Sequence, residues 1–131
     1  MANPNIVAVS NILGGNLGWN LSNTLTATLA TVAADKIVKI NRITVANVDG
    51  TNAADVDLFV DGLTTAGATG FAGTGASATV YIAKTVSVPA DATLVLSDTP
   101  IYLMEGDILK GGASATGDLD LFISYEVLDD A

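Results

Sequence analysis

The chain has 131 residues, a formal net charge of −9, and neither cysteine nor histidine. The missing cysteines and histidines exclude disulfides, thiolate metal sites and the commonest general base. Five basic residues are too few to neutralise phosphates or anionic lipids. We therefore expect a single domain over residues 1–131 that is not an enzyme, needs no cofactor or metal, and binds neither nucleic acid nor membrane.

The composition predicts an all-β protein. Asp outnumbers Glu twelve to two, and the residues that usually fill helix surfaces are scarce, whereas Gly, Thr and Ala are abundant. Short apolar runs separated by turn signals indicate eight or nine short strands. This pattern is typical of an antiparallel β-sandwich, either jelly-roll or immunoglobulin-like. We prefer the jelly roll, because the disulfide and buried-Trp signature of immunoglobulin domains is absent.

The first 34 residues carry no charged side chain. Ile6–Val9 is predicted as a short strand and Asn11–Asn23 as a loop rich in Gly and Asn, while alternation favours a strand over Thr24–Val32. One interpretation is a core strand preceded by a neutral loop. The other is an N-terminal arm over residues 1–23 that packs on another subunit with Trp19 as its anchor, because aromatic residues dominate interface energetics.

The central stretch Lys36–Asp61 shows the clearest period-two alternation and predicts two strands joined by the loop Asp49–Ala54. The apolar phase slips by one residue between Ile40 and Ile43. A one-residue slip would turn the core face outward, so we expect a β-bulge near Asn41-Arg42.

A second uncharged segment, Gly62–Ala83, follows. Its first part, Gly62–Ser77, is predicted as a long flexible loop in which Phe71 is the only large side chain. Beyond it, Gly111–Gly117 is predicted as a loop of small residues. The remaining strands are expected at Ala78–Val88, Thr93–Leu96, Ile101–Met104, Ile108–Lys110 and Asp118–Leu128.

Two acidic segments resemble each other, because Asp118–Ile123 nearly copies Asp55–Val60. Paired carboxylates can perform acid–base chemistry or hold calcium, but we favour solvated strand faces. The apolar residues between them should be buried, and the aromatic residue of each copy should point outward. If the two strands were neighbours, the aromatics would form a patch for a partner; the alternative is that the Gly-rich loop covers them. The residues concerned are Asp55, Asp57, Asp118 and Asp120 as the carboxylates, Val56, Leu58, Val60, Leu119, Leu121 and Ile123 as core, and Phe59 and Phe122 as the aromatics.

Several segments together resemble small virion structural proteins of tailed phages that infect marine cyanobacteria. The similar segments are MANPNIVAVS at the start, ITVANVDGTNAADVDLFV in the centre, and then VSVPADATLVL, TPIYLMEGD and DLDLFISYE. The resemblance covers most of the chain and is weakest over Asn16–Thr31 and Gly62–Ser77. It implies a component of the virion without enzymatic activity, and it does not distinguish head, neck and tail.

These observations lead to three functional hypotheses. The first is a capsid decoration or cement protein on the surface of the phage particle, which binds the major capsid protein or other virion proteins and forms a homo-oligomer. The second is a neck, fibre or tail subunit. The third is a carbohydrate-binding β-sandwich in which Trp19 acts beside the amides of Asn16 and Asn20. The candidate interface residues are Trp19, Phe59, Phe71 and Phe122.

Overall fold

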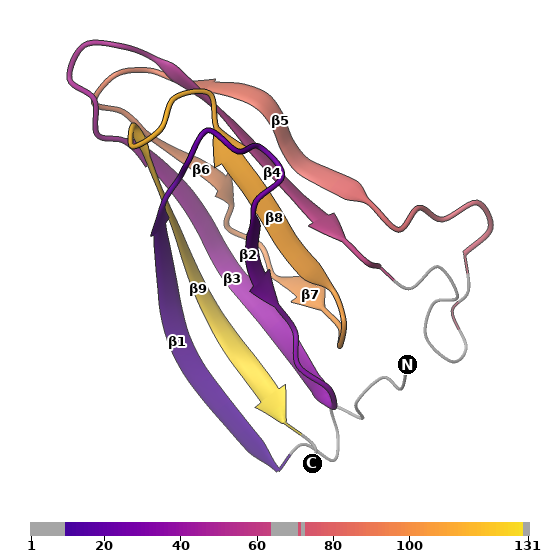
Figure 1. The fold of residues 1–131 in the computed structure, drawn as a ribbon. Helices are drawn as coiled ribbons and strands as arrows, with labels where there is room; N and C mark the ends of the chain where they lie inside the picture. Colours follow the sequence, from indigo (N-terminus) through magenta and orange to yellow (C-terminus); the bar gives the residue numbers. More distant parts are fainter. Residues whose placement is uncertain (1–9, 64–70, 72, 130–131) are drawn as a thin grey trace.

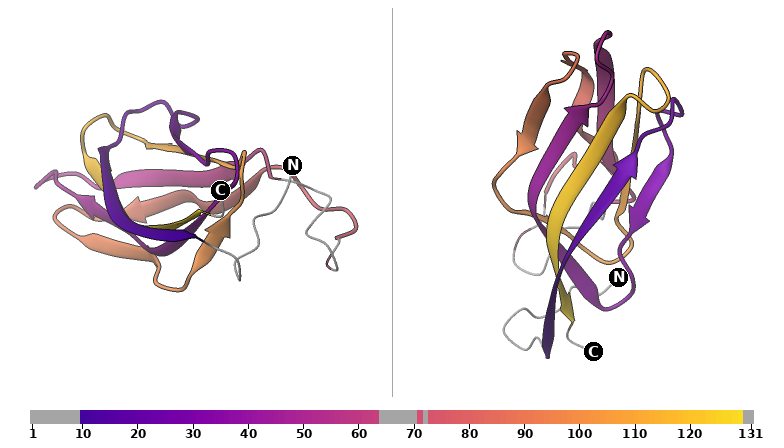
Figure 2. Two further views of the ribbon diagram at one scale, coloured as in Figure 1. Left: turned by 90° about the horizontal axis from the view of Figure 1, so that it is seen from below. Right: turned by 90° about the vertical axis from the view of Figure 1, so that its left-hand side faces the viewer.

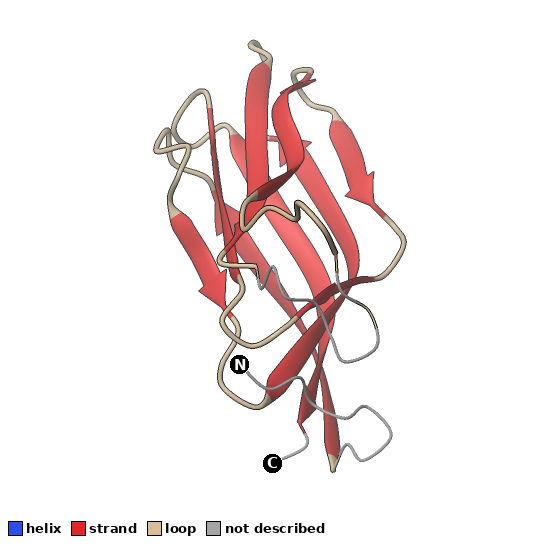
Figure 3. Cartoon of the chain, turned by 90° about the vertical axis from the view of Figure 1, so that its right-hand side faces the viewer, coloured by secondary structure: helices blue, strands red, loops and turns tan. Residues whose placement is uncertain are grey.

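The computed structural model describes residues 10–63, 71 and 73–129, and these residues form nine strands and no helix (Figures 1 and 3). Two antiparallel sheets pack face to face, which confirms the predicted β-sandwich (Figure 2). The strands are β1 (Asn11–Asn20), β2 (Thr28–Thr31), β3 (Lys36–Asn47), β4 (Ala54–Asp61), β5 (Val80–Val88), β6 (Thr93–Ser97), β7 (Ile101–Leu103), β8 (Ile108–Ala113) and β9 (Leu119–Asp129).

The strand order is that of a jelly roll. One sheet, here called sheet A, has the order β1-β9-β3-β6, and β7 pairs with the same side of β3 as β6 does. The other, sheet B, has the order β2-β8-β4-β5. The pairing is nested: β1 pairs with β9, β2 with β8, β3 with β6 and β7, and β4 with β5. Nested pairing of this kind connects the strands as two Greek keys.

The predicted bulge in β3 is confirmed. Ile40 lies opposite Tyr125 and Arg42 lies opposite Ser124, so Asn41 has no counterpart on β9. The Asn41 side-chain amide donates instead to Glu126 Oε1 at 3.2 Å. The extra residue restores the alternation, and both Ile40 and Ile43 are therefore buried.

The core lies between the two sheets and contains the predicted apolar residues of both acidic segments. All six are at most 5% exposed. These side chains come from β4 and from the first half of β9, which are central strands of sheets B and A. The predicted core residues that are buried are Val56, Leu58, Val60, Leu119, Leu121 and Ile123.

The prediction of a loop over Asn11–Asn23 is wrong for its first ten residues, which form β1 at the edge of sheet A. Gly and Asn disfavour strands, but β9 supplies an uninterrupted ladder for the whole of β1. Gly15 has a specific role here, because a Cβ on it would lie 2.7 Å from the Tyr125 hydroxyl. The Tyr125 ring covers the glycine opposite, which fixes the register. The part of the predicted arm before residue 10, including the strand predicted at Ile6–Val9, lies outside the described residues.

Two other predicted boundaries differ where the segment before β2 approaches β8. The strand predicted at Thr24–Val32 is only β2, since the residues before it form a turn in which the Ala27 N–H donates to the Thr24 carbonyl. A Cβ on Gly112 would clash with the Thr24 carbonyl and lie 2.9 Å from the Ser22 carbonyl. Gly111 and Gly112 thus continue β8 where a loop was predicted, because only residues without a side chain allow this approach. Of the predicted loop Gly62–Ser77, residues 64–70 and 72 lie outside the described residues.

The burial pattern of β9 can be tested with two adjacent substitutions. Leu121→Asp should prevent folding, because it places an unpaired charge in a core position that is 1% exposed. Phe122→Asp should leave the fold intact, because Phe122 is 47% exposed. Circular dichroism and thermal melting of both variants measure the difference. Equal melting temperatures for the two proteins would contradict the register of β9.

Candidate protein-interaction surface

The four aromatic residues predicted as an interface do not form one patch. Phe59 lies on β4 in sheet B, whereas Trp19 and Phe122 lie on β1 and β9 in sheet A. Phe71 is 82% exposed and lies between segments outside the described residues. The condition for a patch of Phe59 with Phe122 was that their strands be neighbours, and it is not met, because the two similar acidic segments belong to different sheets.

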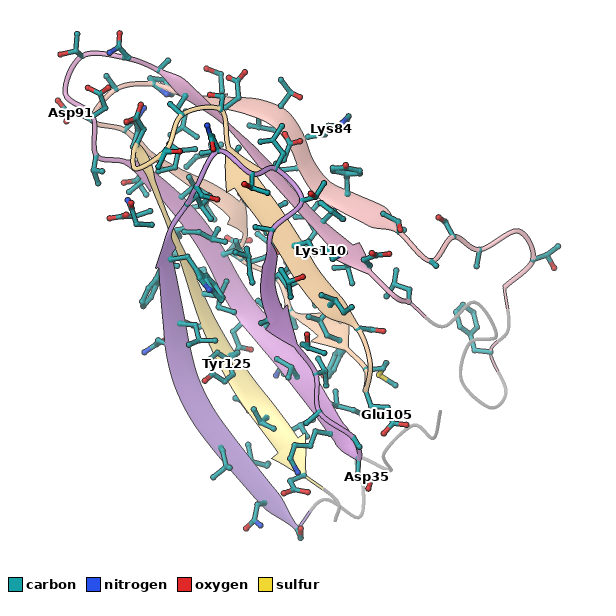
Figure 4. The ribbon with its side chains drawn as sticks, viewed as in Figure 1. Asp35, Lys84, Asp91, Glu105, Lys110 and Tyr125 are labelled. Carbon is teal, nitrogen blue, oxygen red and sulfur yellow. The ribbon has the colours of Figure 1, made fainter. Side chains whose placement is uncertain are left out.

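Phe59 was predicted to point outward, with cover by the Gly-rich loop as the alternative; it does point away from the core, but Tyr81 of β5 covers it, and it is 5% exposed. It lies on the outer face of sheet B, where its ring packs against Tyr81 of β5 with centroids 4.8 Å apart. Lys84 of β5 is labelled in Figure 4, and its Nζ lies 4.7 Å from the centroid of the Tyr81 ring, a cation–π contact. The Tyr81 ring shields Phe59 from solvent on the outer face of sheet B. Phe59 therefore contributes to packing between β4 and β5.

Asp57 was predicted to be solvated and is instead buried, with 6% exposure. Its carboxylate accepts the Thr85 backbone N–H at 2.7 Å. Thr85 has φ of 52°, in the left-handed region, at a place where the register of β4 with β5 shifts. The Asp57 carboxylate therefore stabilises the irregular backbone of β5 at Thr85 by a charge-assisted hydrogen bond.

Trp19 and Phe122 do lie together. They line a shallow groove of about 300 Å³ with Gly18, Asn20 and Asp120. Trp19 also packs against the core from the sheet edge, and Phe122 is half exposed. The Asn20 amide donates to Asp120 Oδ1 at 2.7 Å and to the Gly117 carbonyl at 3.0 Å. Phe122 was correctly predicted to point outward.

A second groove lies between the sheets on the side where β1 and β2 are the edge strands. Its volume is about 180 Å³ and its lining is almost entirely apolar. Leu17 of β1 forms one wall, and two further large side chains of β1, Ile12 and Leu13, are more than half exposed nearby along the strand. We call the side chains of Leu13 and Leu17 together with this groove the β1 surface, since Ile12 alternates to the opposite face of sheet A; β1 faces the viewer in the right-hand view of Figure 2. The groove is lined by Leu17, Ala30, Thr31, Val32, Val38, Tyr125 and Val127.

The β1 surface was not recognised from the sequence. The signal was present, since Leu13, Leu17 and Trp19 all occupy odd positions, as in a strand with one apolar face. The same ten residues contain three glycines and three asparagines, which disfavour strands, and the segment was therefore predicted as a loop. Three exposed apolar side chains, Ile12, Leu13 and Leu17, thus lie in a segment that the sequence suggested to be a loop.

The carboxylates of the two acidic segments lie apart from each other. No group of three or more metal-ligating side chains occurs among residues 10–63, 71 and 73–129. The two acidic pairs lie on opposite sheets, and Asp57 is occupied by its bond to Thr85. Within the same residues there is no helix long and apolar enough to cross a membrane.

Neither the known protein families nor the curated protein sequences give a match to this chain.

The role of Asp57 predicts unequal effects for two substitutions on one strand. Asp57→Ala should lower the free energy of unfolding by about 1–2 kcal/mol, because the Thr85 N–H loses a charged acceptor. Asp55→Ala, two residues earlier on the same face and only partly buried, should cost less than about 0.5 kcal/mol. Chemical denaturation measures both values, and equal values would show that the bond to Thr85 is unimportant.

Asp61 should make stability depend on pH. Its carboxylate accepts bonds from the Thr79 hydroxyl, Lys110 Nζ and the Gly62 N–H, which together lower its pKa to about 2. A lowered pKa in the folded state stabilises the fold above the ordinary value of 3.8, and this stabilisation is lost as the pH falls towards 2. Asp61→Asn should therefore lower the melting temperature at neutral pH, and the difference should vanish near pH 2. Asp98→Asn, at an exposed turn, is the charge-matched control.

Proposed function

We propose that this chain is a non-enzymatic virion structural protein, a capsid decoration or cement protein that binds the head of a tailed phage and also binds copies of itself. The observation that carries the proposal is the distribution of exposed apolar side chains. Among the residues that the structure describes, seven of the eleven large exposed ones belong to the two uncharged segments, residues 1–34 and Gly62–Ala83. In a chain with a net charge of −9, this arrangement separates neutral contact surfaces from acidic, solvated ones.

The two neutral surfaces lie on opposite sides of the sandwich. β1 is an edge strand of sheet A and β5 is the far edge strand of sheet B, beside β6. Val80 and Tyr81 of β5 are 50% and 41% exposed. A protein with contact surfaces on opposite sides can bind the shell through one and a neighbouring copy through the other, which is what a cement protein requires.

The resemblance to virion proteins of cyanobacteria-infecting phages supports the same class, and the jelly roll is a fold found in viral capsid domains. Because one fold hosts many functions, the surface and not the fold carries the argument. A neck, fibre or tail subunit would share these properties and differ in copy number.

Carbohydrate binding is a second candidate, and the groove lined by Trp19, Asn20 and Phe122 favours it. Aromatic rings beside polar groups are typical of sugar-binding sites, and jelly rolls also occur in lectins. Asn16 does not belong to this groove, and the Asn20 amide is already bonded within the protein. A glycan array decides between the candidates, because a purely structural protein should bind none of its sugars.

The proposal is tested by adding purified protein to phage particles that lack it and counting bound copies. A head decoration protein should bind in hundreds of copies, and a neck or fibre subunit in a number on the order of ten, because the symmetry of each location fixes the count. Binding should change little with salt, since apolar contacts are not screened as ion pairs are. Saturation at about ten copies, or release by moderate salt, would contradict a neutral docking surface on the head.

Val80→Asp should reduce the number of copies bound, since it places a charge on the neutral surface of β5. Val95→Asp is a matched control on β6, where a half-exposed valine lies on a strand outside both neutral segments. Both variants should fold normally because both side chains are exposed. Equal binding by the two variants would contradict docking through β5.

A further inference from the structure

The outer edge of β1 is the one sheet edge, among the described residues, that carries no protection against strand addition. β2 has four residues and a register shift, and β6 and β7 are short strands separated by the turn Asp98–Pro100. β5 has two register shifts, the charged Lys84 and a left-handed residue. In contrast, β1 pairs with β9 over ten residues without a shift and contains neither charge nor proline.

The backbone groups that β1 presents at this edge can be assigned. The Leu21 N–H donates to the Leu119 carbonyl at 2.8 Å, in the same register as β1 and β9. Backbone groups in a strand alternate in direction, so the odd-numbered residues of β1 face β9. The even-numbered residues, Ile12, Gly14, Asn16, Gly18 and Asn20, therefore point their N–H and C=O groups away from it. They form a regular row of donors and acceptors along the outer edge.

One pair of large side chains on β1 is placed symmetrically about Gly15. Leu13 and Leu17 lie two residues before and after it, on the face that points between the sheets, and they are 59% and 41% exposed. An antiparallel strand of the same sequence, centred on Gly15, would place Leu13 of each copy opposite Leu17 of the other. This register also pairs even-numbered with even-numbered residues, so the outward backbone groups meet as donors and acceptors.

From these observations we propose that β1 pairs antiparallel with β1 of a second copy, so that two A sheets become one continuous sheet across a two-fold axis. The second copy covers the exposed Leu13 and Leu17, and its leucines extend the apolar lining of the β1 surface. The inference rests on the copy–copy contact of the proposed function and specifies where that contact lies.

Charge favours a second copy as the occupant despite the net charge of −9. No charged side chain lies on β1, so none faces another across the seam. The nearest acidic residues on this sheet are on β9, and the two β9 strands would be three strand spacings apart, about 14 Å. That distance exceeds the Debye length of about 8 Å at physiological salt, so their repulsion is largely screened.

The test is the oligomeric state of the purified full-length chain by sedimentation. The wild-type protein should be a dimer. Asn16→Pro should be monomeric and folded, because it removes one outward N–H without removing a bond to β9. A wild-type protein that stays monomeric at all concentrations would overturn the proposal, and so would a folded Asn16→Pro protein that remains dimeric.

Two double variants test the register and do not depend on tolerance of proline. Leu13→Lys with Leu17→Lys places like charges opposite each other twice and should weaken the dimer about tenfold or more. Leu13→Lys with Leu17→Glu places each Lys opposite a Glu and should remain dimeric. Equal behaviour of the two would overturn pairing centred on Gly15. The control, Val95→Lys with Tyr102→Lys on the opposite edge of sheet A, should leave the dimer unchanged.

The sedimentation experiments test the β1 pairing independently of the proposed decoration role, because they use no phage particles. A monomer that still coats particles would overturn only the β1 pairing. A dimer that never binds particles would overturn only the decoration role.

Discussion

β3 and β9 pair from Lys36 with Asp129 to Asn47 with Leu119, and the other strands of sheet A attach to one or other of this pair. The ladder can run this far only because it bulges at Asn41. Without the extra residue, either the Ile40 half or the Ile43 half of β3 would turn its apolar side chains to solvent. The bulge thus decides which residues form the core, and it sets the faces on which β1 and β6 add their own side chains.

Much of this arrangement could be predicted from the sequence, because period-two alternation reports burial directly. The strands with β-branched residues, the bulge and the core of both acidic segments were all found in that way. β1 was missed because Gly15 favours a loop when considered alone, and the Tyr125 ring that covers it comes from a residue 110 positions later. Local propensity contains no information about such a partner.

The errors at the candidate site have a similar origin. Asp57 and Phe59 have the alternation of a solvated face, and the structure covers both of them with groups from β5. The Thr85 N–H reaches Asp57 because β5 is irregular there, and Tyr81 reaches Phe59 across the same strand pair. Phe122, in the equivalent place of the other acidic segment, has no such neighbour in β5 and is exposed. Two segments of nearly identical sequence therefore have different environments, and sequence similarity within the chain was a poor guide to function.

The nested order of the strands has a consequence for how the protein folds as it is synthesised. Ser10 and Asp129 are hydrogen-bonded partners although 119 positions separate them. β1 leaves the ribosome first of the nine strands, and its ladder partner β9 leaves last. Sheet A therefore cannot close until nearly all of the described chain has been made, and contacts of such long sequence separation make folding slow. During that interval the apolar side chains of β1 are unpaired in every nascent chain on a polysome, and neighbouring chains must avoid pairing prematurely through them.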